Sequence, residues 1–382
     1  MRPEVVGEAY AAVTGRSLEA HEIGVSHLAP GSRVVAAMSG GVDSAVAAAL
    51  LHGAGFKTVG VSMRLGTSAA RADGHVGCCS LDDFDDARRA AETLGVAHYV
   101  VDLREVFQAR VVDPFVASYA EGRTPNPCTL CNRDVKFDAF WDYAETIGAE
   151  AIGTGHYARV GREGGVFSLH AGVDAAKDQS YFLFTLGQAE LARTAFPVGD
   201  LSKERVRALA GALDLPVASK PESQDICFVA GGRYTDFVEA ALAPEDRRPG
   251  TIRDAAGRTL GRHEGIHGYT VGQRRGLGGG APEPRFVTSI DPDSATIVVG
   301  SRADLERDGL EVRDVRWTNG PRPGRASVRL RHRHEPVGCT VRVDGGITRV
   351  RFDEPTGGVT PGQAAVWYEG DRVLGGGWIA AK

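Results

Sequence analysis

Residues 34–44 read VVAAMSGGVDS, an apolar run that leads into a glycine-rich turn. The apolar run predicts a buried strand, and residues 45–52 after the turn predict a helix. Two consecutive glycines let the backbone fold tightly and bring several N–H groups toward one point, at the positive end of the helix dipole. Residues 39–44 therefore predict a phosphate loop, although they lack the lysine that follows the last glycine of a Walker loop.

The alternation of apolar runs and helical patterns continues beyond the phosphate loop. We expect strands over 58–63, 98–102 and 151–155, and a helix over 82–94 that carries its aspartates near the positive N-terminal end. Strands and helices in this order predict an α/β fold, with a parallel sheet and helices on both faces.

The pattern changes twice along the chain, which predicts three domains. We assign residues 1–217 to the parallel-sheet domain, with 1–30 as an N-terminal extension. Residues 218–285 are rich in Gly and Arg, and predict a small central domain whose loops wrap a partner. Residues 286–382 contain a series of short strands, which predicts a C-terminal β-barrel domain.

Length and charge set broad limits on function. A chain of 382 residues is long enough for two or three domains. The formal net charge of −5 argues against a protein that coats nucleic acid indiscriminately, but it allows a local basic patch. No stretch resembles a membrane span or a secretory signal, so we expect a cytoplasmic protein with reduced thiols.

The cysteines are too few for a disulfide scaffold in a chain of this length. Cys128 and Cys131 have the spacing of metal ligands or of a redox pair, and two prolines before them stiffen the chain at a helix start. Cys227 lies far downstream, in the segment that joins the domains. Cys78 and Cys79 are adjacent and chelate poorly, and we expect Cys339 in a strand of the core.

Seven short motifs extend in order over nearly the whole chain after its first thirty residues. The motifs are SGGVDS at 39–44, CCS at 78–80, GRTPNPCTLCN at 122–132, GTGHY at 153–157, KDQSY at 177–181, DICF at 225–228 and GQRRG at 272–276. This combination resembles the tRNA-specific 2-thiouridylase family of PP-loop ATP pyrophosphatases. The resemblance implies a sulfurtransferase that thiolates C2 of the wobble uridine of tRNA, and releases AMP and pyrophosphate.

The resemblance also implies a role for individual residues. Cys131 matches the nucleophile, and Cys227 matches the cysteine that carries a persulfide. The ATP site would comprise Ala37, Met38, Ser39, Gly40, Gly41, Val42, Asp43, Ser44, Met63 and Gly155. The contacts to tRNA and its target base would comprise Asn126, Pro127, Cys128, His156, Lys177, Asp178, Gln179, Arg331, His332 and Gln363.

The mechanism that follows begins with transfer of AMP to the C2 oxygen of the uridine, with Asp43 holding Mg²⁺ against the phosphates. The persulfide of Cys227 then delivers sulfur, and Cys131 and Cys227 finish as a disulfide. We expect ATP and Mg²⁺ as cofactors and a central domain that contacts tRNA. The sulfur would come from a relay protein or a cysteine desulfurase, and the protein would be a monomer.

Cys128 leaves a second mechanism open. Together with Cys131 and Cys227 it makes three thiols, which suit a [4Fe–4S] cluster with one open site, while a structural zinc normally takes four ligands. Two other classes of function compete with thiolation. Another PP-loop adenylating ligase would have no use for Cys131 and Cys227, and a non-catalytic RNA-binding or metal-binding module would release no pyrophosphate.

Arginines in the predicted barrel suggest where RNA binds. Arg329, Arg331 and Arg333 alternate with other residues, so a strand would place their guanidinium groups on one face. Such a face is often merely solvated. The resemblance and the need to hold phosphates favour an RNA contact.

Overall fold

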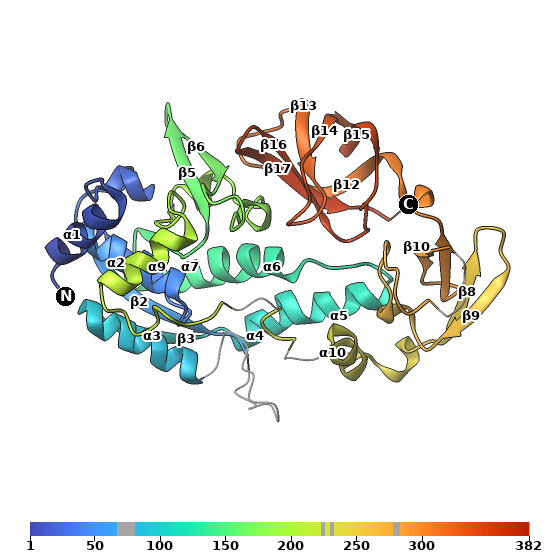
Figure 1. The fold of residues 1–382 in the computed structure, drawn as a ribbon, viewed down its shortest axis with the longest axis horizontal. Coiled ribbons are helices and arrows are strands. Elements are labelled where there is room, and N and C mark those ends of the chain that lie inside the picture. Colours follow the sequence, from blue (N-terminus) through green and yellow to red (C-terminus); the bar gives the residue numbers. More distant parts are fainter. Residues whose placement is uncertain (67–80, 223–225, 230–232, 278–282, 382) are drawn as a thin grey trace. The chain divides into compact units, whose positions relative to one another are not determined.

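The computed structural model describes residues 1–66, 81–222, 226–229, 233–277 and 283–381 (Figure 1). The chain packs into two compact units. The first unit comprises Met1–Arg110, Cys128–Gly231 and Asp371–Val373. The second unit comprises Val111–Pro127, Gly232–Gly370 and Leu374–Lys382.

A five-stranded parallel sheet forms the centre of the first unit, with the strand order β3-β2-β1-β4-β7. Its strands are β1 (Arg33–Ala37), β2 (Lys57–Arg64), β3 (His98–Asp102), β4 (Ala151–Gly153) and β7 (Thr194–Ala195). The predicted strands over 58–63 and 98–102 agree with β2 and β3 within one residue. β4 ends at Gly153, two residues before the end that we predicted.

Helices cover both faces of this sheet. On one face, Val34 and Ala36 of β1 share a hydrophobic cluster with helices α1 (Pro3–Thr14), α2 (Val42–Gly53), α3 (Leu81–Leu94) and α9 (Lys203–Ala212). Val35 alternates with them and points to the other face, and α7 (Phe140–Thr146) packs against β4. The predicted parallel sheet between layers of helices is confirmed.

The N-terminal extension belongs to the core of the first unit. α1 and a short 3-10 helix over Ala20–Ile23 bury Val6, Tyr10 and Ile23, each at most 1% exposed, in the cluster that also contains α2 and α9. The buried face of α1 accounts for the helix, because an isolated helix of this length is marginal in water without packing.

A hairpin of the first unit pairs with residues from the far end of the sequence. β5 (Ala158–Glu163) and β6 (Val166–Ala171) form the hairpin, and β6 pairs with Arg372 and Val373 at the start of β17 (Arg372–Ile379). Asp371 forms an ion pair with Arg159, and its Oδ1 lies 3.1 Å from Nδ1 of His170. Residues 371–373 therefore complete the first unit.

The second unit contains a four-stranded sheet with the order β10-β11-β8-β9. Its strands are β8 (Gly250–Asp254), β9 (Thr259–His263), β10 (Phe286–Asp291) and β11 (Thr296–Gly300). Two helices of the same unit, α5 (Asp113–Ala120) and α10 (Tyr234–Ala241), meet through aromatic rings, with Tyr119 stacked on Tyr234 at 4.8 Å between centroids.

A closed antiparallel barrel of six strands follows. Its strands run in the order β12 (Arg307–Trp317), β15 (Ile347–Thr356), β14 (Val337–Asp344), β13 (Gly324–Arg329), β16 (Ala364–Glu369) and β17, and β12 pairs with β17 to close it. Trp367 and Cys339 are fully buried in its core, as expected for Cys339. The strand series predicted from residue 286 is thus divided, because β10 and β11 pair with β8 and not with the barrel.

Among the described residues, none of the helices combines the length and the apolar character that a bilayer crossing requires.

Candidate functional site

The phosphate loop at residues 39–44 joins β1 to α2, as the sequence predicts. α2 begins at Val42, three residues before the predicted start, so Asp43 and Ser44 lie in its first turn. Ser39 N–H donates to Ser44 Oγ at 3.1 Å, and Ser44 Oγ donates to Gly41 O at 3.0 Å. These bonds fix the loop at the positive end of the α2 dipole, a site that suits an anion.

Two glycines of the predicted ATP site are required by close contacts. Gly40 has φ of 72°, and a Cβ there would overlap the backbone carbonyl of Asp83. A Cβ on Gly155 would lie 2.7 Å from the backbone N of Ser44. Any other residue at either position would push the loop or its neighbour away.

The other residues of the predicted ATP site lie at the carboxyl ends of β1 and β2, where ligands of α/β sheets bind. Ala37 ends β1 and Met63 lies near the end of β2. Met38 is 2% exposed, and its carbonyl accepts a hydrogen bond of 2.6 Å from Ser62 Oγ. The structure therefore places these residues along one edge of the sheet with the phosphate loop.

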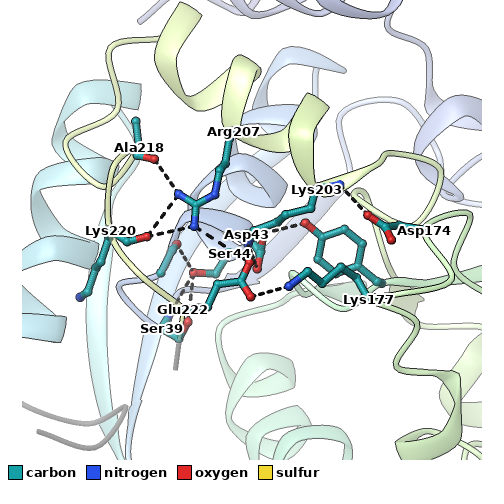
Figure 2. Close-up of polar contacts among 12 residues, drawn as sticks. Ser39, Asp43, Ser44, Asp174, Lys177, Lys203, Arg207, Ala218, Lys220 and Glu222 are labelled. Carbon is teal, nitrogen blue, oxygen red and sulfur yellow. Dashed lines mark hydrogen bonds and ion pairs between the residues drawn. The ribbon is translucent and has the colours of Figure 1, made fainter. Parts of the chain in front are cut away.

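Asp43 is already bound by a lysine, Lys203, that no sequence motif indicates. Lys203 Nζ lies 2.7 Å from Asp43 Oδ1 and 2.8 Å from Asp43 Oδ2, and its side chain is 11% exposed (Figure 2). Tyr157 O–H donates to Asp43 Oδ1 at 2.8 Å. Burial raises the pKa of Tyr157 far above its ordinary value, so the phenol keeps the proton that it donates.

A second carboxylate, that of Glu222, lies close to three cationic side chains of the site. Its carboxylate lies 2.6 Å from Lys177 Nζ, 2.9 Å from Lys203 Nζ and 4.0 Å from Arg207 Nη2. We call Lys177, Lys203 and Arg207 the cation cluster. The hydrogen bond from Lys177, together with the bond and charge of Lys203, lowers the pKa of Glu222 to about 2. No local pattern reveals this arrangement, because its members come from separate parts of the sequence.

Lys177, Asp178 and Gln179 were predicted to contact tRNA, and all three interact within the first unit. Lys177 binds Glu222. Asp178 is 3% exposed and accepts hydrogen bonds from Gly172 N at 3.1 Å and from Ser180 N at 3.0 Å. Gln179 Oε1 accepts a bond of 3.0 Å from Tyr157 N. In this structure Asp178 and Gln179 hold the backbone beside Tyr157.

His156 follows β4 and is held as a neutral ring. Its Nδ1 shares a hydrogen bond of 2.7 Å with Thr154 Oγ1, and its ring packs edge-on against Phe196 and tilted against Phe137. Burial lowers the pKa of His156 well below its ordinary value. The ring can donate or accept a hydrogen bond toward a ligand but carries no charge at neutral pH.

The CxxC pair lies at a helix start, as predicted. Cys128 is exposed in α6 (Pro127–Leu130), and Cys131 is 7% exposed at the start of a π-helix over Cys131–Ala139. Asn132 donates to Phe182 O at 3.2 Å and anchors the π-helix. A π-helix widens the backbone spacing locally, and such bulges occur often at functional sites.

The structure describes Cys227, which was predicted to carry the sulfur, but not the adjacent cysteines Cys78 and Cys79. Cys227 is partly exposed. Cys78, Cys79 and Asp225, which belong to two of the seven motifs, lie outside the described residues. Within the described ranges, no three His, Cys, Asp or Glu side chains form a group that could hold a metal ion.

The remaining predicted tRNA contacts belong to the second unit. Gln363 Nε2 donates to Thr124 O at 3.1 Å and to Pro125 O at 3.0 Å, which fastens the segment before Cys128. Asn126 is 6% exposed, and Pro127 is buried as the first residue of α6. Arg331 is exposed and His332 is partly exposed.

The predicted arginine face is wrong. β13 ends at Arg329, and a turn follows in which His334 N donates to Arg331 O at 3.0 Å. The guanidinium of Arg329 lies 4.8 Å from the centroid of the Tyr368 ring. The turn breaks the alternation, so Arg331 and Arg333 do not continue the strand face of Arg329.

Comparison with known proteins identifies the family. Three family models match consecutive parts of the chain: "tRNA methyl transferase HUP domain" at 32–231, "tRNA methyl transferase PRC-barrel domain" at 235–301 and "Aminomethyltransferase beta-barrel domain" at 307–379. The chain is 49% identical to the tRNA-specific 2-thiouridylase MnmA of Geobacter metallireducens, over 91% of this chain and 97% of that protein. The chain belongs to the tRNA-specific 2-thiouridylase family.

Other members of the family are similar over the same extent. Identity to the 2-thiouridylase of Solibacter usitatus is 48%, over 92% of this chain and all of that protein. Identity to that of Moorella thermoacetica is 47%, over 90% of this chain and 98% of that protein. The family membership confirms the predicted fold class of a parallel-sheet domain, a small central domain and a C-terminal barrel.

Proposed function

We propose that this protein is an ATP-dependent tRNA sulfurtransferase that replaces the C2 oxygen of the wobble uridine with sulfur. The observation that carries the proposal is its close similarity, over nine tenths of its length, to proteins named for 2-thiouridylation. The geometry of the phosphate loop supports the use of ATP, because its fixed N–H groups and the α2 dipole suit the phosphates.

The need for ATP follows from the chemistry of the base. A carbonyl oxygen is a poor leaving group, whereas the same oxygen bonded to AMP leaves readily. The phosphate loop would hold the β- and γ-phosphates, which depart as pyrophosphate when the uridine oxygen attacks the α-phosphorus. The AMP-activated C2 then accepts a sulfur nucleophile.

Asp43 fits a magnesium ligand only if Lys203 moves. Its carboxylate is shared by Lys203 and Tyr157 in this structure. Transfer of Lys203 to the phosphates would open an oxygen of Asp43 toward Mg²⁺, which prefers carboxylate and phosphate oxygens. Mg²⁺ held there would neutralise charge on the departing pyrophosphate.

Sulfur transfer is assigned to Cys227 and Cys131. The outer sulfur of a Cys227 persulfide bonds to C2, and AMP leaves. The Cys131 thiolate then attacks the inner sulfur of Cys227, so that the persulfide S–S bond breaks and its electron pair stays on the base sulfur. A disulfide between Cys131 and Cys227 forms, and an external thiol reductant must reopen it.

A [4Fe–4S] cluster on Cys128, Cys131 and Cys227 does not fit the described arrangement, in which no three such ligands are grouped. The proposed partners are tRNA, bound by the central domain and the barrel, and a cysteine desulfurase or relay protein. We propose that the protein acts in the cytoplasm as a monomer.

The test is mass spectrometry of nucleosides from tRNA incubated with the protein, ATP, Mg²⁺ and a desulfurase. We expect 2-thiouridine only when ATP is present. Cys227→Ser should lose thiolation with this donor, and full activity of that variant would exclude the persulfide mechanism.

Cys128→Asp separates the persulfide mechanism from the cluster mechanism. The variant should keep at least a third of the activity if two cysteines suffice, and should lose the activity if a cluster is required. Iron analysis after anaerobic purification gives an independent answer.

A further inference from the structure

Glu222 occupies a position that suits an anionic ligand. Two of its three cationic partners lie within 3 Å, and the most buried of them, Lys203, also binds Asp43 of the phosphate loop. Figure 2 shows Lys177 and Lys203 reaching Glu222 from different elements, with Arg207 beside them. The carboxylate therefore lies where the cation cluster meets the phosphate loop.

Two members of the cation cluster, Arg207 and Lys203, are also held by groups other than the Glu222 carboxylate. Arg207 Nη1 donates to Ala218 O at 3.1 Å and to Lys220 O at 3.3 Å. The backbone N–H of Lys203 donates to Asp174 Oδ2 at 2.9 Å, which fixes the start of α9. Arg207 and Lys203 would thus remain near the loop after Glu222 left, and Lys177 would lose the carboxylate that it binds here.

The balance of charge favours exchange with a polyphosphate. Three cations face two carboxylates, Asp43 and Glu222, beside N–H groups that already favour an anion. A pyrophosphate group carries more charge and more acceptor oxygens than one carboxylate, so it competes well for lysine and arginine.

We propose that Glu222 is an internal anion that the phosphates of ATP displace from Lys177, Lys203 and Arg207, and that the exchange changes the reactivity of Cys227. The inference rests on the proposed function, because it takes ATP as the ligand of the loop and Cys227 as the sulfur carrier. It assigns Glu222 a positioning role.

The sequence links the exchange to the sulfur carrier. Cys227 follows Glu222 by five residues, which can span at most about 18 Å. Lys220, two residues before Glu222, is fixed by ion pairs of 2.7 Å to Asp83 and 2.6 Å to Asp86 of α3. Ion pairs of Lys220 and of Glu222 therefore hold the chain before Cys227 in place. Nucleotide phosphates would break the ion pairs of Glu222 and leave those of Lys220 intact.

The first experiment measures binding of Mg²⁺–pyrophosphate by calorimetry, without tRNA or a sulfur source. Glu222→Gln keeps the shape of the side chain and removes its charge, so it should bind pyrophosphate about tenfold more tightly than the wild type. Glu204→Gln is the matched control, because it removes one charge from an exposed residue next to Lys203 and should change affinity less than twofold. Equal or weaker binding by Glu222→Gln overturns the proposal.

The second experiment follows alkylation of Cys227 by iodoacetamide, with peptide mass spectrometry and exposed Cys128 as the internal reference. Pyrophosphate should change the rate at Cys227, relative to Cys128, at least threefold in the wild type. In Glu222→Gln the rate should match the ligand-bound wild type and should not respond. If pyrophosphate leaves the ratio of the Cys227 alkylation rate to the Cys128 alkylation rate unchanged in the wild type, the proposed effect on Cys227 is overturned.

The two proposals fail separately. Loss of tRNA thiolation with intact pyrophosphate exchange would exclude the proposed function and leave the exchange standing. Normal thiolation with unchanged pyrophosphate affinity in Glu222→Gln would exclude only the exchange.

Discussion

Gly40 shows how one residue sets the phosphate loop. Its φ of 72° is strained for any residue with a side chain, and a Cβ would also overlap the carbonyl of Asp83. The strain and the overlap have different effects, because strain lowers stability while the overlap displaces the loop from α3.

We expect Gly40→Ala to raise the Kd for ATP at least tenfold, measured by calorimetry. Gly55→Ala is the matched control, since Gly55 has φ of 84° but open space around the position of a Cβ. It should lose about 1 kcal/mol of stability and keep its ATP affinity. A similar loss of ATP affinity in both variants would contradict the steric argument.

His156 makes stability depend on pH. Burial lowers the pKa of His156 in the folded protein. As the pH falls through about 6.5, this histidine therefore binds a proton in the unfolded chain but not in the folded chain. The contribution of His156 to stability is therefore fully present above about pH 6.5 and is lost as the pH falls below that value.

His156→Asn should make the fall in Tm between pH 7.5 and 5.5 shallower than in the wild type, as measured by thermal unfolding. Part of the slope should remain, because burial also lowers the pKa of His27 and His98. Parallel curves for the two proteins would show that His156 does not carry this dependence.

The sequence predicts the place of residues 39–44 between a strand and a helix, because these residues lie in one motif. It does not predict Lys203 or Glu222. Lys203 pairs with an aspartate 160 residues earlier in the chain, and such an ion pair depends on tertiary structure that no local pattern encodes. Because Lys203 already binds the Asp43 carboxylate, Asp43 can bind Mg²⁺ only after Lys203 moves.

At the scale of elements, α1 links the extension to the core. Val6 is fully buried on the face of α1 that packs on α2 and α9, while its neighbour Val5 is 36% exposed. The extension thus contributes to the stability of the first unit.

Val6→Ala should lower the free energy of unfolding of the first unit by about 2 kcal/mol, from lost apolar burial and the cavity left behind. Val5→Ala makes the same chemical change at the surface and should cost less than 0.5 kcal/mol. Chemical denaturation followed by tryptophan fluorescence and ATP binding measures both. Equal costs would mean that α1 is not packed as described.

Elements could be predicted where an apolar run bounded by turns marks them. β2 and β3 are such runs, and their ends match the prediction within one residue. The prediction that Arg329, Arg331 and Arg333 share one strand face was wrong, because alternation in the sequence does not reveal the turn at residues 331–334. The sequence also did not show that β10 and β11 pair with β8, since partner choice among short strands is set by tertiary contacts.

At the scale of the whole molecule, a chain of net charge −5 must bind polyanionic tRNA through local positive groups. Arg331 is exposed in the turn after β13, where a phosphate can approach it. Arg325 lies in the same barrel but forms an ion pair with Asp353.

Arg331→Ala should weaken tRNA binding several-fold and reduce the slope of log K against log salt by about 1. Arg325→Ala is the control and should leave the slope unchanged, because Asp353 already neutralises that charge. Filter binding over a series of salt concentrations tests both. An unaltered slope in Arg331→Ala would remove this residue from the interface.

The pairing of β6 with Arg372 and Val373 affects how the protein can be made. During translation, β6 remains an open strand edge and Arg159 lacks Asp371 until residues 371–373 have been synthesised. An open edge can pair with other chains, so the nascent first unit should need protection by a chaperone. For the same reason, a fragment that stops at residue 231 should aggregate more readily than the full chain, and adding residues 371–373 through a linker should reduce the effect.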